Sequence, residues 1–330
     1  MKKTMSLFLS MTLLVIFAVA CGTEDETSAV ENDDTTVAEN EDENSEEEES
    51  SEIVVEHELG ETTVPKNPEN VVVFDYGTLD TLRELDADIA AVPQGNIPDY
   101  LSEFEDGTFE NAGTLFEPDF ETIFDIQPEL IIISGRSSDA YDELSDIAPT
   151  IYMGVDNTNY MESFEQNATI LGEIFEKEDV VEDALVSIDE SINELYETAS
   201  TNDKNGLIIL ANDGSVSAYG PGSRFGILHD DFGVQPADEN IEASTHGQNI
   251  SFEYIVETNP DYLFVIDRDS AVSEGEESSS QAIVENDLVM NTTAYEEDNI
   301  IYLDPAYWYL AGGGLTSVSE MVREIQEGLK

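Results

Sequence analysis

The stretch FETIFDIQPELIIISGR at residues 120–136 is echoed without a gap by FEYIVETNPDYLFVIDR at residues 252–268. At this offset of 132 positions, Phe, Glu, Ile, Pro and Arg are identical, and an acidic residue follows each proline. Each copy has the pattern of a short helix, a proline turn and a buried apolar strand. Two apolar runs can easily match by chance, but a chance match of Glu and Arg in the same register is much less probable. We therefore predict two related lobes, each with an arginine at the carboxyl end of a strand.

A long helix is predicted between the two copies. Residues 173–205 contain no Gly or Pro, and their apolar positions recur at steps of three and four. This predicts one helix over residues 178–200, about 34 Å long at 1.5 Å per residue. A coiled-coil strand is the alternative, although two to three heptads are short for one.

Short apolar runs alternate with helical patterns on both sides of this helix. They lie at 71–74, 89–92, 130–133 and 150–152 before it, and at 207–211, 262–266 and 300–303 after it. Continuous apolar strands separated by helices indicate α/β layers with largely parallel sheets. The predicted fold class is therefore α/β, with two lobes joined by one long rigid helix. We expect an N-terminal lobe at 53–176, the linking helix at 177–204 and a C-terminal lobe at 205–330.

The first 21 residues have the features of a secretion signal. Lys2 and Lys3 precede an apolar run at residues 5–20, which is shorter than the roughly 20 residues of a spanning helix. This predicts a signal peptide at 1–20. Cys21, the single cysteine, follows Ala-Val-Ala, and the stretch resembles a bacterial lipobox, whose cysteine is acylated and becomes the mature N-terminus. An ordinary signal peptide with a chance cysteine, or a short anchor helix, is the alternative.

Acidic residues dominate the rest of the chain. Residues 22–52 hold 15 Asp or Glu and no Lys or Arg, which predicts a disordered, self-repelling tether at 21–52. The whole chain has 11 Lys+Arg against 75 Asp+Glu, a net charge of −64. A charge of this sign argues against nucleic acid as a partner, because phosphate backbones require clustered basic residues. Salt screens such self-repulsion, so we expect a saline or alkaline habitat.

Arginine is scarce, and its positions are informative. Three of the five arginines after residue 53 lie where a cleft between the lobes would be lined. Two end the repeated strands, and ligands bind outside the carboxyl ends of strands in open α/β sheets. The third follows a Gly/Pro turn in YGPGSRFG at 219–226. Because guanidinium carries a permanent charge and a planar fork of donors, these residues predict an anion site; separate surface ion pairs are the alternative. The three are Arg136, Arg224 and Arg268.

Two further segments are candidates for the cleft wall. His246 lies in the polar loop STHGQ, and Tyr307, Trp308 and Tyr309 lie between Pro305 and three consecutive glycines. A loop hydrogen-bonding role for His246 and a core role for the aromatic residues are the alternatives. No role is assigned to the other two histidines, His57 and His229.

No motif for catalysis is present. The sequence lacks the Lys-Ser/Thr of a phosphate loop, the Gly-x-Ser-x-Gly elbow and the His-Glu-x-x-His helix. Three widely spaced histidines argue against a transition-metal site made by the protein alone. A Ser/His/Asp triad stays open as an alternative, although nothing in the sequence points to one, and we expect a binding protein without an intrinsic cofactor rather than an enzyme.

The segments GTLFEPDFE at 113–121, SGR at 134–136, AYGPGSRFG at 218–226, STHGQ at 244–248 and YWYL at 307–310 resemble one known family. This family is the substrate-binding lipoproteins of siderophore ABC importers, of the ferric catecholate, petrobactin type. The resemblance implies an Fe(III)-siderophore as ligand, an ABC permease as partner and attachment to the extracytoplasmic face of the cell membrane through the N-terminal lipid. The same architecture carrying haem, cobalamin or a ferric hydroxamate is the alternative; a secreted hydrolase or an adhesion module would belong to a different class.

The resemblance also implies roles for particular residues. Arg136, Arg224 and Arg268 would face the anionic chelate. His246 and a tyrosine, best matched by Tyr307 with Tyr309 next in line, would ligate iron that a tetradentate catecholate leaves undersaturated. One glutamate on each lobe would contact arginine on the permease, and the repeat assigns these to Glu121 and Glu253.

Overall fold

The computed structural model of the 330-residue chain describes residues 51–272 and 280–330. The predicted signal peptide, Cys21 and all but the last two residues of the predicted tether lie outside the described residues. The first described strand, β1 (Glu52–His57), pairs antiparallel with β2 (Gly60–Pro65). Regular structure in the described residues therefore begins at Glu52.

The sheet of the N-terminal lobe has five parallel strands in the order β5-β4-β3-β6-β7. Its central strands are fully buried because helices lie on both faces. The strands are β3 (Val71–Val73), β4 (Ile89–Val92), β5 (Glu110–Asn111), β6 (Ile131–Ile133) and β7 (Thr150–Tyr152). The helical segments are α1 (Tyr76–Glu84), η1 (Asp99–Glu105), α2 (Phe120–Ile126), η2 (Ser138–Ala140) and α3 (Tyr141–Ser145).

The sheet of the C-terminal lobe has six strands and is mixed. Its order is β11-β9-β8-β12-β13, with the short β10 beside β8. The strands are β8 (Asn205–Asn212), β9 (Ser215–Tyr219), β10 (Gln235–Pro236), β11 (Gln248–Ile250), β12 (Tyr262–Asp267) and β13 (Ile300–Leu303). The helical segments are α6 (Ile227–Asp230), α7 (Phe252–Thr258), α8 (Arg268–Val272), α9 (Ser280–Val284), η3 (Val289–Asn291), α10 (Thr293–Glu296) and η4 (Ala306–Leu310).

The expectation of largely parallel sheets holds for the first lobe and needs a correction for the second. Strand β9 runs antiparallel to β8, and β11 runs antiparallel to β9. The reason is a two-residue turn at Asp213 and Gly214, both of which have positive φ (47° and 72°). An Asp-Gly pair between apolar runs favours this type of tight hairpin, which reverses the chain where a crossover helix was expected.

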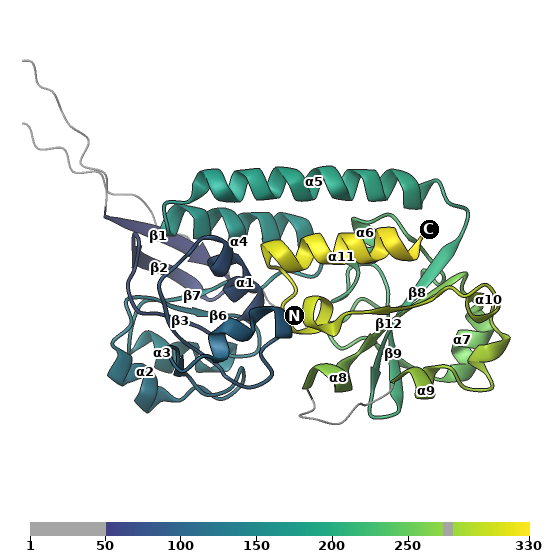
Figure 1. The fold of residues 1–330 in the computed structure, drawn as a ribbon, viewed down its shortest axis with the longest axis horizontal. Helices are drawn as coiled ribbons and strands as arrows, with labels where there is room; N and C mark the ends of the chain where they lie inside the picture. The colour runs from purple at the N-terminus through teal and green to yellow at the C-terminus, as the bar shows by residue number, and fades with distance from the viewer. Residues whose placement is uncertain (1–50, 273–279) are drawn as a thin grey trace, which may run out of the picture. The chain divides into compact units, whose positions relative to one another are not determined.

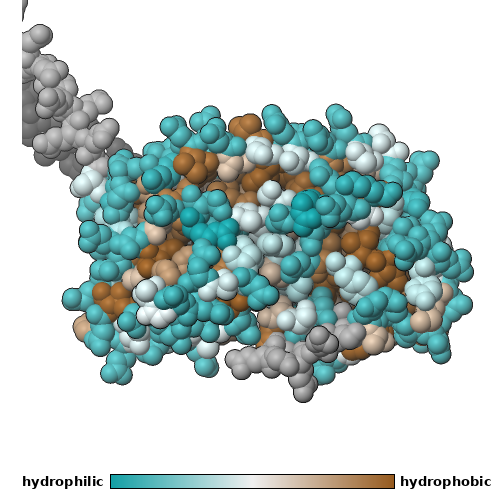
Figure 2. Space-filling model, viewed as in Figure 1, coloured by the Kyte–Doolittle hydropathy of each residue, from teal (hydrophilic) through white to brown (hydrophobic). Residues whose placement is uncertain are grey.

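Three helices form a layer along both lobes, and α5 (Glu178–Ser200) is the uppermost of the three in Figure 1. The predicted helix over 178–200 coincides with α5. Its buried stripe packs against α4 (Tyr160–Ile174) and α11 (Leu315–Gly328), which excludes the coiled-coil alternative for this stripe. Helix α11 also packs against α1 of the N-terminal lobe, so the C-terminal helix joins the two lobes a second time. Figure 2 shows apolar residues in the band beneath α5 and hydrophilic residues over most of the same face.

The sequence repeat is a repeated structural unit. Helices α2 and α7 both have seven residues and start at equivalent positions. A side-chain oxygen caps each helix, from Asp119 in one copy and Ser251 in the other. Each helix ends on a left-handed residue, Gln127 at φ 55° and Asn259 at φ 45°. The repeat therefore specifies the beginning and the end of each helix as well as its apolar face.

The acidic residue after each proline has the same role in both lobes. Glu129 accepts a hydrogen bond from the backbone N–H of Glu69 at 2.8 Å, just before β3. Asp261 accepts one from the N–H of Asn205 at 2.9 Å, at the start of β8. Each carboxylate thus links the start of its own strand to the start of the neighbouring strand.

Within the described part of the chain, no helix is long and apolar enough to cross a membrane.

Candidate functional site

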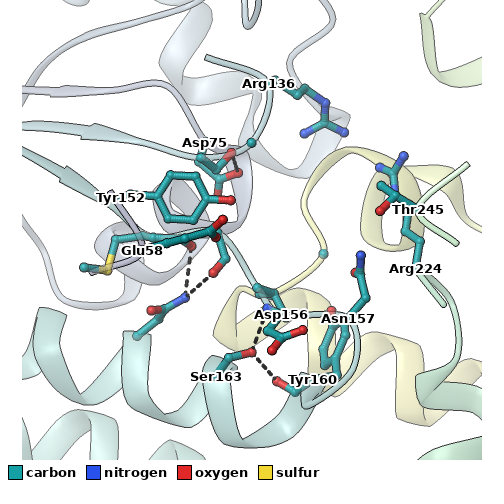
Figure 3. A pocket seen from close by; sticks show the side chains of 18 of the residues that line it. Glu58, Asp75, Arg136, Tyr152, Asp156, Asn157, Tyr160, Ser163, Arg224 and Thr245 are labelled. Atoms are coloured by element: carbon teal, nitrogen blue, oxygen red, sulfur yellow. Dashed lines mark hydrogen bonds between the residues drawn. The ribbon is translucent and has the colours of Figure 1, made fainter. Parts of the chain in front are cut away.

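A cleft of about 1220 Å³ lies between the two lobes, and both contribute to its lining (Figure 3). The carboxyl ends of β3, β6 and β7 reach it from the first lobe, followed by Asp75, Ser134 and Met153. The second lobe contributes the loop after β9, the loop before β11 and the η4 turn. Parallel strands present their following loops at one edge of a sheet, which is where ligands bind in α/β folds.

The three predicted arginines converge on one residue, Tyr309. Arg136 donates from Nη2 to the Tyr309 carbonyl at 2.6 Å, and Arg224 donates from Nη2 to the same oxygen at 2.7 Å. Arg268 donates from Nε to the Tyr309 hydroxyl at 2.9 Å. The Arg224 guanidinium also lies over the Tyr309 ring, 4.4 Å from its centre. We call Arg136, Arg224 and Arg268 the arginine cluster.

Two members of the arginine cluster have no ion-pair partner in the part of the chain that the structure describes. Among the six ion pairs of the described residues, none includes Arg136 or Arg224, and Arg268 meets Asp269 only at 3.9 Å. Burial, and then the neighbouring charge of Arg136, lower the pKa of Arg224 from its ordinary value. The alternative of separate surface ion pairs therefore does not hold for Arg136 and Arg224. Their positive charges remain available to an anion.

A glycine-rich turn places Arg224 in the cleft. Gly222 has φ 69°, a left-handed conformation that favours glycine, and its N–H donates to Asp230 at 2.6 Å. The buried hydroxyl of Ser223 donates to the Gly220 carbonyl. These local hydrogen bonds hold the turn closed just before Arg224. The glycine-rich stretch at 219–226 therefore fixes the position of this guanidinium.

The hydroxyl of Tyr309 is easier to ionise than that of an ordinary tyrosine. Burial acts to raise its pKa, but the hydrogen bond from Arg268 and the charges of Arg224, Arg268 and Arg136 outweigh burial and lower it. Tyr309, a residue of the cleft lining, thus has a phenol oxygen in a cationic surround. Such an oxygen suits a hard metal ion such as Fe(III), which prefers anionic oxygen donors.

Tyr307, which was expected to face the ligand, lies outside the cleft lining. Among the described residues, the cleft lining includes Tyr309 but not Tyr307. The ring of Tyr307 packs against that of Tyr100 with the centres 4.9 Å apart. The two tyrosines are two positions apart in η4, a π-helical turn, and side chains at this spacing do not share a face of a helix. Trp308, between them, is 2 % exposed and donates to Glu324 at 2.8 Å.

The other predicted residues are placed as follows. His246 is exposed and lines the cleft opposite the first lobe. Arg268 reaches the cleft through Tyr309, since it is outside the lining itself. Glu121 and Glu253 are exposed in the first turns of α2 and α7, and neither lines the cleft. Cys21 lies outside the described residues.

Several cleft residues were missed in the sequence. The lining includes His57, to which no role was assigned, and the tyrosines Tyr152 and Tyr160. It also includes five carboxylates, from Glu56, Glu58, Asp75, Asp139 and Asp156. Asp75 had a readable signal, because it directly follows the apolar run 71–74 as Arg136 follows its strand. The other four carboxylates do not stand out in a chain with 75 acidic residues. Among the described residues, no group of three or more His, Cys, Asp or Glu is arranged to hold a metal ion.

Two α/β lobes, a joining helix layer and a charged cleft between the lobes define a two-lobed ligand-binding protein. Residues 71–307 match the periplasmic binding protein family, and the chain belongs to that family. It is 49% identical over 334 residues to the petrobactin-binding protein YclQ of Bacillus subtilis, with 100% of each chain covered. It is 32% identical over 281 residues to the ferric-anguibactin-binding protein FatB of Vibrio anguillarum, covering 84% of this chain and 87% of that one.

Solved structures agree with this assignment. The crystal structure of YclQ superimposes with a TM-score of 0.82 at 54% identity, covering 85% of this chain and 99% of that chain. The catecholate-siderophore-binding protein VctP of Vibrio cholerae gives a TM-score of 0.80 at 38% identity, with 84% and 99% covered. The predicted fold class and family resemblance are thereby confirmed.

Proposed function

We propose that the protein is the extracytoplasmic substrate-binding component of an ABC importer and captures a ferric catecholate siderophore. The relatives described above are named for siderophores, and one is named for catecholates. The observation that carries the proposal is the arginine cluster, in which three guanidiniums meet at Tyr309 and two of them have no ion-pair partner among the described residues. The protein itself performs binding and delivery, with no bond made or broken.

The charge of the arginine cluster matches that of the chelate. A ferric tris-catecholate carries three net negative charges and a ferric bis-catecholate carries one, and the three positive charges of the cluster can counter either. At an effective dielectric near 20, one guanidinium at about 4 Å from a unit charge gains roughly 4 kcal/mol before desolvation is counted. Haem would require an apolar slot, and a neutral ferric hydroxamate would leave the cluster without a counter-charge.

Iron coordination by the protein is a finer proposal. A bis-catecholate leaves two positions of an octahedral Fe(III) open, and phenolate oxygen and imidazole nitrogen both suit that ion. We assign the two positions to Tyr309 and His246, because both line the cleft and Tyr307 does not. The lowered pKa of Tyr309 favours the phenolate form that would bind the metal.

Anchoring and docking complete the proposal. Removal of residues 1–20 and acylation of Cys21 would tie the protein to the membrane through the acidic segment up to residue 52. The body would then comprise a lobe at 53–176, the helix at 177–204 and a lobe at 205–330. The exposed Glu121 and Glu253 occupy equivalent places on the two lobes, which suits a permease with two matched arginine sockets.

The fluorescence of Trp308 tests the proposal. It is the only tryptophan, and it lines the cleft, so a change on titration reports on this site. Ferric catecholates should quench it strongly at low concentration, whereas neutral ferric hydroxamates and iron-free catecholates should act only weakly. The Trp308→Phe protein supplies the blank for inner-filter absorption by the chelate. Equal affinity for catecholate and hydroxamate would overturn the charge-based assignment.

A further inference from the structure

Three phenylalanines close together in the first lobe are exposed to solvent. Phe116 is 68 % exposed, Phe120 39 % and Phe124 65 %, and we call them the exposed phenylalanines. Phe120 and Phe124 lie four residues apart on α2, so their rings share one face of the helix. None of the three packs against a hydrophobic cluster of the described residues. One exposed apolar residue is ordinary on a protein surface, whereas a group of aromatic rings marks an interaction surface.

The equivalent helix of the second lobe has no such surface. At the repeat offset of 132 residues, Phe120 corresponds to Phe252 and Phe124 to Val256. Phe252 is half-buried and packs against the core of the second lobe, and none of the large apolar side chains of α7, all of them described, is exposed. The shared scaffold therefore does not require exposed rings at these positions. Their exposure on α2 points to a partner.

A closed loop before α2 presents Phe116 to solvent. The Thr114 N–H donates to the Glu117 carbonyl at 3.0 Å, and the Glu117 N–H donates to the Thr114 hydroxyl at 2.9 Å. Gly113 has φ 106°, and a Cβ at this position would collide with the Glu117 carbonyl. The Asp119 carboxylate then caps α2. Because a closed turn and a capped helix hold the exposed phenylalanines, little conformational freedom is lost when a partner covers them.

The position of Phe116 indicates which partner covers this surface. Phe116 lines the cleft but stays mostly exposed, so it lies at the mouth of the cleft. A protein that receives the ligand has to cover this mouth, and Phe116 then falls within its contact area. The carboxylates of Glu117, Glu121 and Asp125 lie among the phenylalanines in the sequence and are exposed. This alternation suits an apolar protein surface bordered by basic side chains, and it repels an anionic lipid surface.

We propose that the exposed phenylalanines form an apolar contact with the permease, which receives them in a hollow bordered by arginine or lysine. The inference rests on the proposed function and adds an apolar surface to the docking glutamates, since Glu121 directly follows Phe120. Buried aromatic side chains supply much of the affinity of protein interfaces. An exposed charge at the rim of an interface contributes mainly to the rate and the orientation of docking. Docking of the first lobe would therefore depend on both kinds of contact.

Uptake of a ferric bis-catecholate by cells tests this inference. Phe120→Ser/Phe124→Ser removes two rings that do not line the cleft, so the Trp308 titration should give a ligand affinity within twofold of the unaltered chain. Uptake should nevertheless fall about fivefold or more at equal amounts of the protein in the cell envelope. Val180→Ser/Val186→Ser is the matched control, because it removes two exposed apolar side chains from α5, at the opposite edge of the molecule from α2 in Figure 1. Uptake by this control should be unchanged.

A crosslink identifies the partner directly. A photo-reactive phenylalanine analogue at position 124 should crosslink to an epitope-tagged permease subunit in these cells, whereas the same analogue at position 186 should not. Unchanged uptake by the Phe120→Ser/Phe124→Ser protein, with no crosslink from position 124, would overturn this inference while the proposed function stands. If the unaltered chain neither binds the chelate nor supports uptake, both fail. Loss of ligand affinity in the double variant would assign the two rings to the cleft and also overturn the inference.

Two measurements on the full Cys21→Ala chain, which lacks the acceptor for the lipid, test other occupants of this surface. The chain should sediment as a monomer and should not float with phosphatidylglycerol vesicles. A dimer that Phe120→Ser/Phe124→Ser converts to a monomer would assign the surface to a second copy. Flotation that the same change abolishes would assign it to lipid. Either result would overturn the permease contact.

Discussion

The two lobes contain the same repeated unit but present opposite chemistry to the cleft. In the first lobe, the strands and the loops after them lead to five carboxylates and one arginine, Arg136, at the cleft. In the second, they lead to Arg224, Arg268 and His246, with Tyr309 from the η4 turn. The unit shared by both lobes is the capped helix, the proline turn and the tie between strands. The difference shows that the repeat specifies a scaffold, whereas the loops beyond it specify what is bound.

The largest expected effect contrasts the arginines of the two lobes. Arg224→Gln should weaken ferric catecholate binding about 100-fold or more, because it removes a buried charge whose truncation typically costs about 2–5 kcal/mol. Arg136→Gln should cost about tenfold, because the second lobe still supplies two guanidiniums. Titration of Trp308 fluorescence measures both, with the exposed Arg323→Gln on α11 as the control. Equal losses of affinity in the Arg136→Gln and Arg224→Gln proteins would contradict the expectation that the second lobe contributes more to binding.

The next prediction concerns a carboxylate that joins the lobes. Asp80 of α1 is fully buried, accepts from the Ser317 N–H of α11 at 2.8 Å and lies 3.6 Å from Arg83. Burial raises its pKa to about 6, against the opposing effect of the Ser317 bond and the Arg83 charge. The folded state therefore binds this proton more tightly than the unfolded state, so the free energy of unfolding falls as pH rises from about 4 to about 6. The expected contribution is roughly 3 kcal/mol for a shift of about two units.

The Asp80→Asn protein isolates that contribution. Its free energy of unfolding, relative to that of the unaltered chain, should rise between pH 4.5 and pH 7 because the amide does not ionise. Urea unfolding at constant high salt measures the difference, since salt screens the general repulsion of the acidic chain. The exposed Asp179→Asn on α5 should show no such trend. A constant difference between Asp80→Asn and the unaltered chain across this range would contradict a raised pKa.

The third prediction tests whether the lobes are equivalent on the outside. Glu121→Ala/Glu253→Ala should spare ligand affinity, because neither residue lines the cleft, and should lower siderophore uptake by cells about tenfold or more. Each single change should do less, and by similar amounts, if both lobes dock alike. Wild-type uptake in the double variant would show that another surface docks. Loss of ligand affinity would show that these glutamates serve the cleft instead.

The smallest effect separates the two tyrosines of the η4 turn. Tyr309→Phe should lower affinity for a ferric bis-catecholate about three- to tenfold and remove the phenolate-to-iron band from the visible spectrum. Tyr307→Phe, against Tyr100 and away from the cleft, should leave both unchanged. A spectral loss with Tyr307→Phe alone would reverse the assignment.

Much of the scaffold could be predicted from the sequence, because repeats and periodicity follow local rules. The offset of 132 residues located α2 and α7, and the absence of Gly and Pro located α5. The hairpin at Asp213 and Gly214 also left a readable signal that was not used. These features depend on neighbours along the chain, so a single sequence contains them.

The cleft could be predicted only in part. Arg136 and Arg268 were found through the repeat and Arg224 through its glycine turn, since scarce residues stand out. Side-chain direction within the π-helical η4 turn depends on backbone geometry, so the choice between Tyr307 and Tyr309 could not be made. The five cleft carboxylates and Tyr160 lie on segments that meet only in the folded chain, and in so acidic a sequence the carboxylates do not stand out.

The shared acceptor at Tyr309 has a consequence for the rate of delivery. One carbonyl accepts from a guanidinium of each lobe, so a catecholate oxygen that takes these donors replaces an existing acceptor. When the chelate leaves, the Tyr309 carbonyl can accept from both guanidiniums again, so neither donor is left unpaired. We expect this exchange of acceptors to lower the barrier to release at the permease. A carrier protein must release its ligand as well as bind it, and an internal acceptor that can replace the ligand favours release.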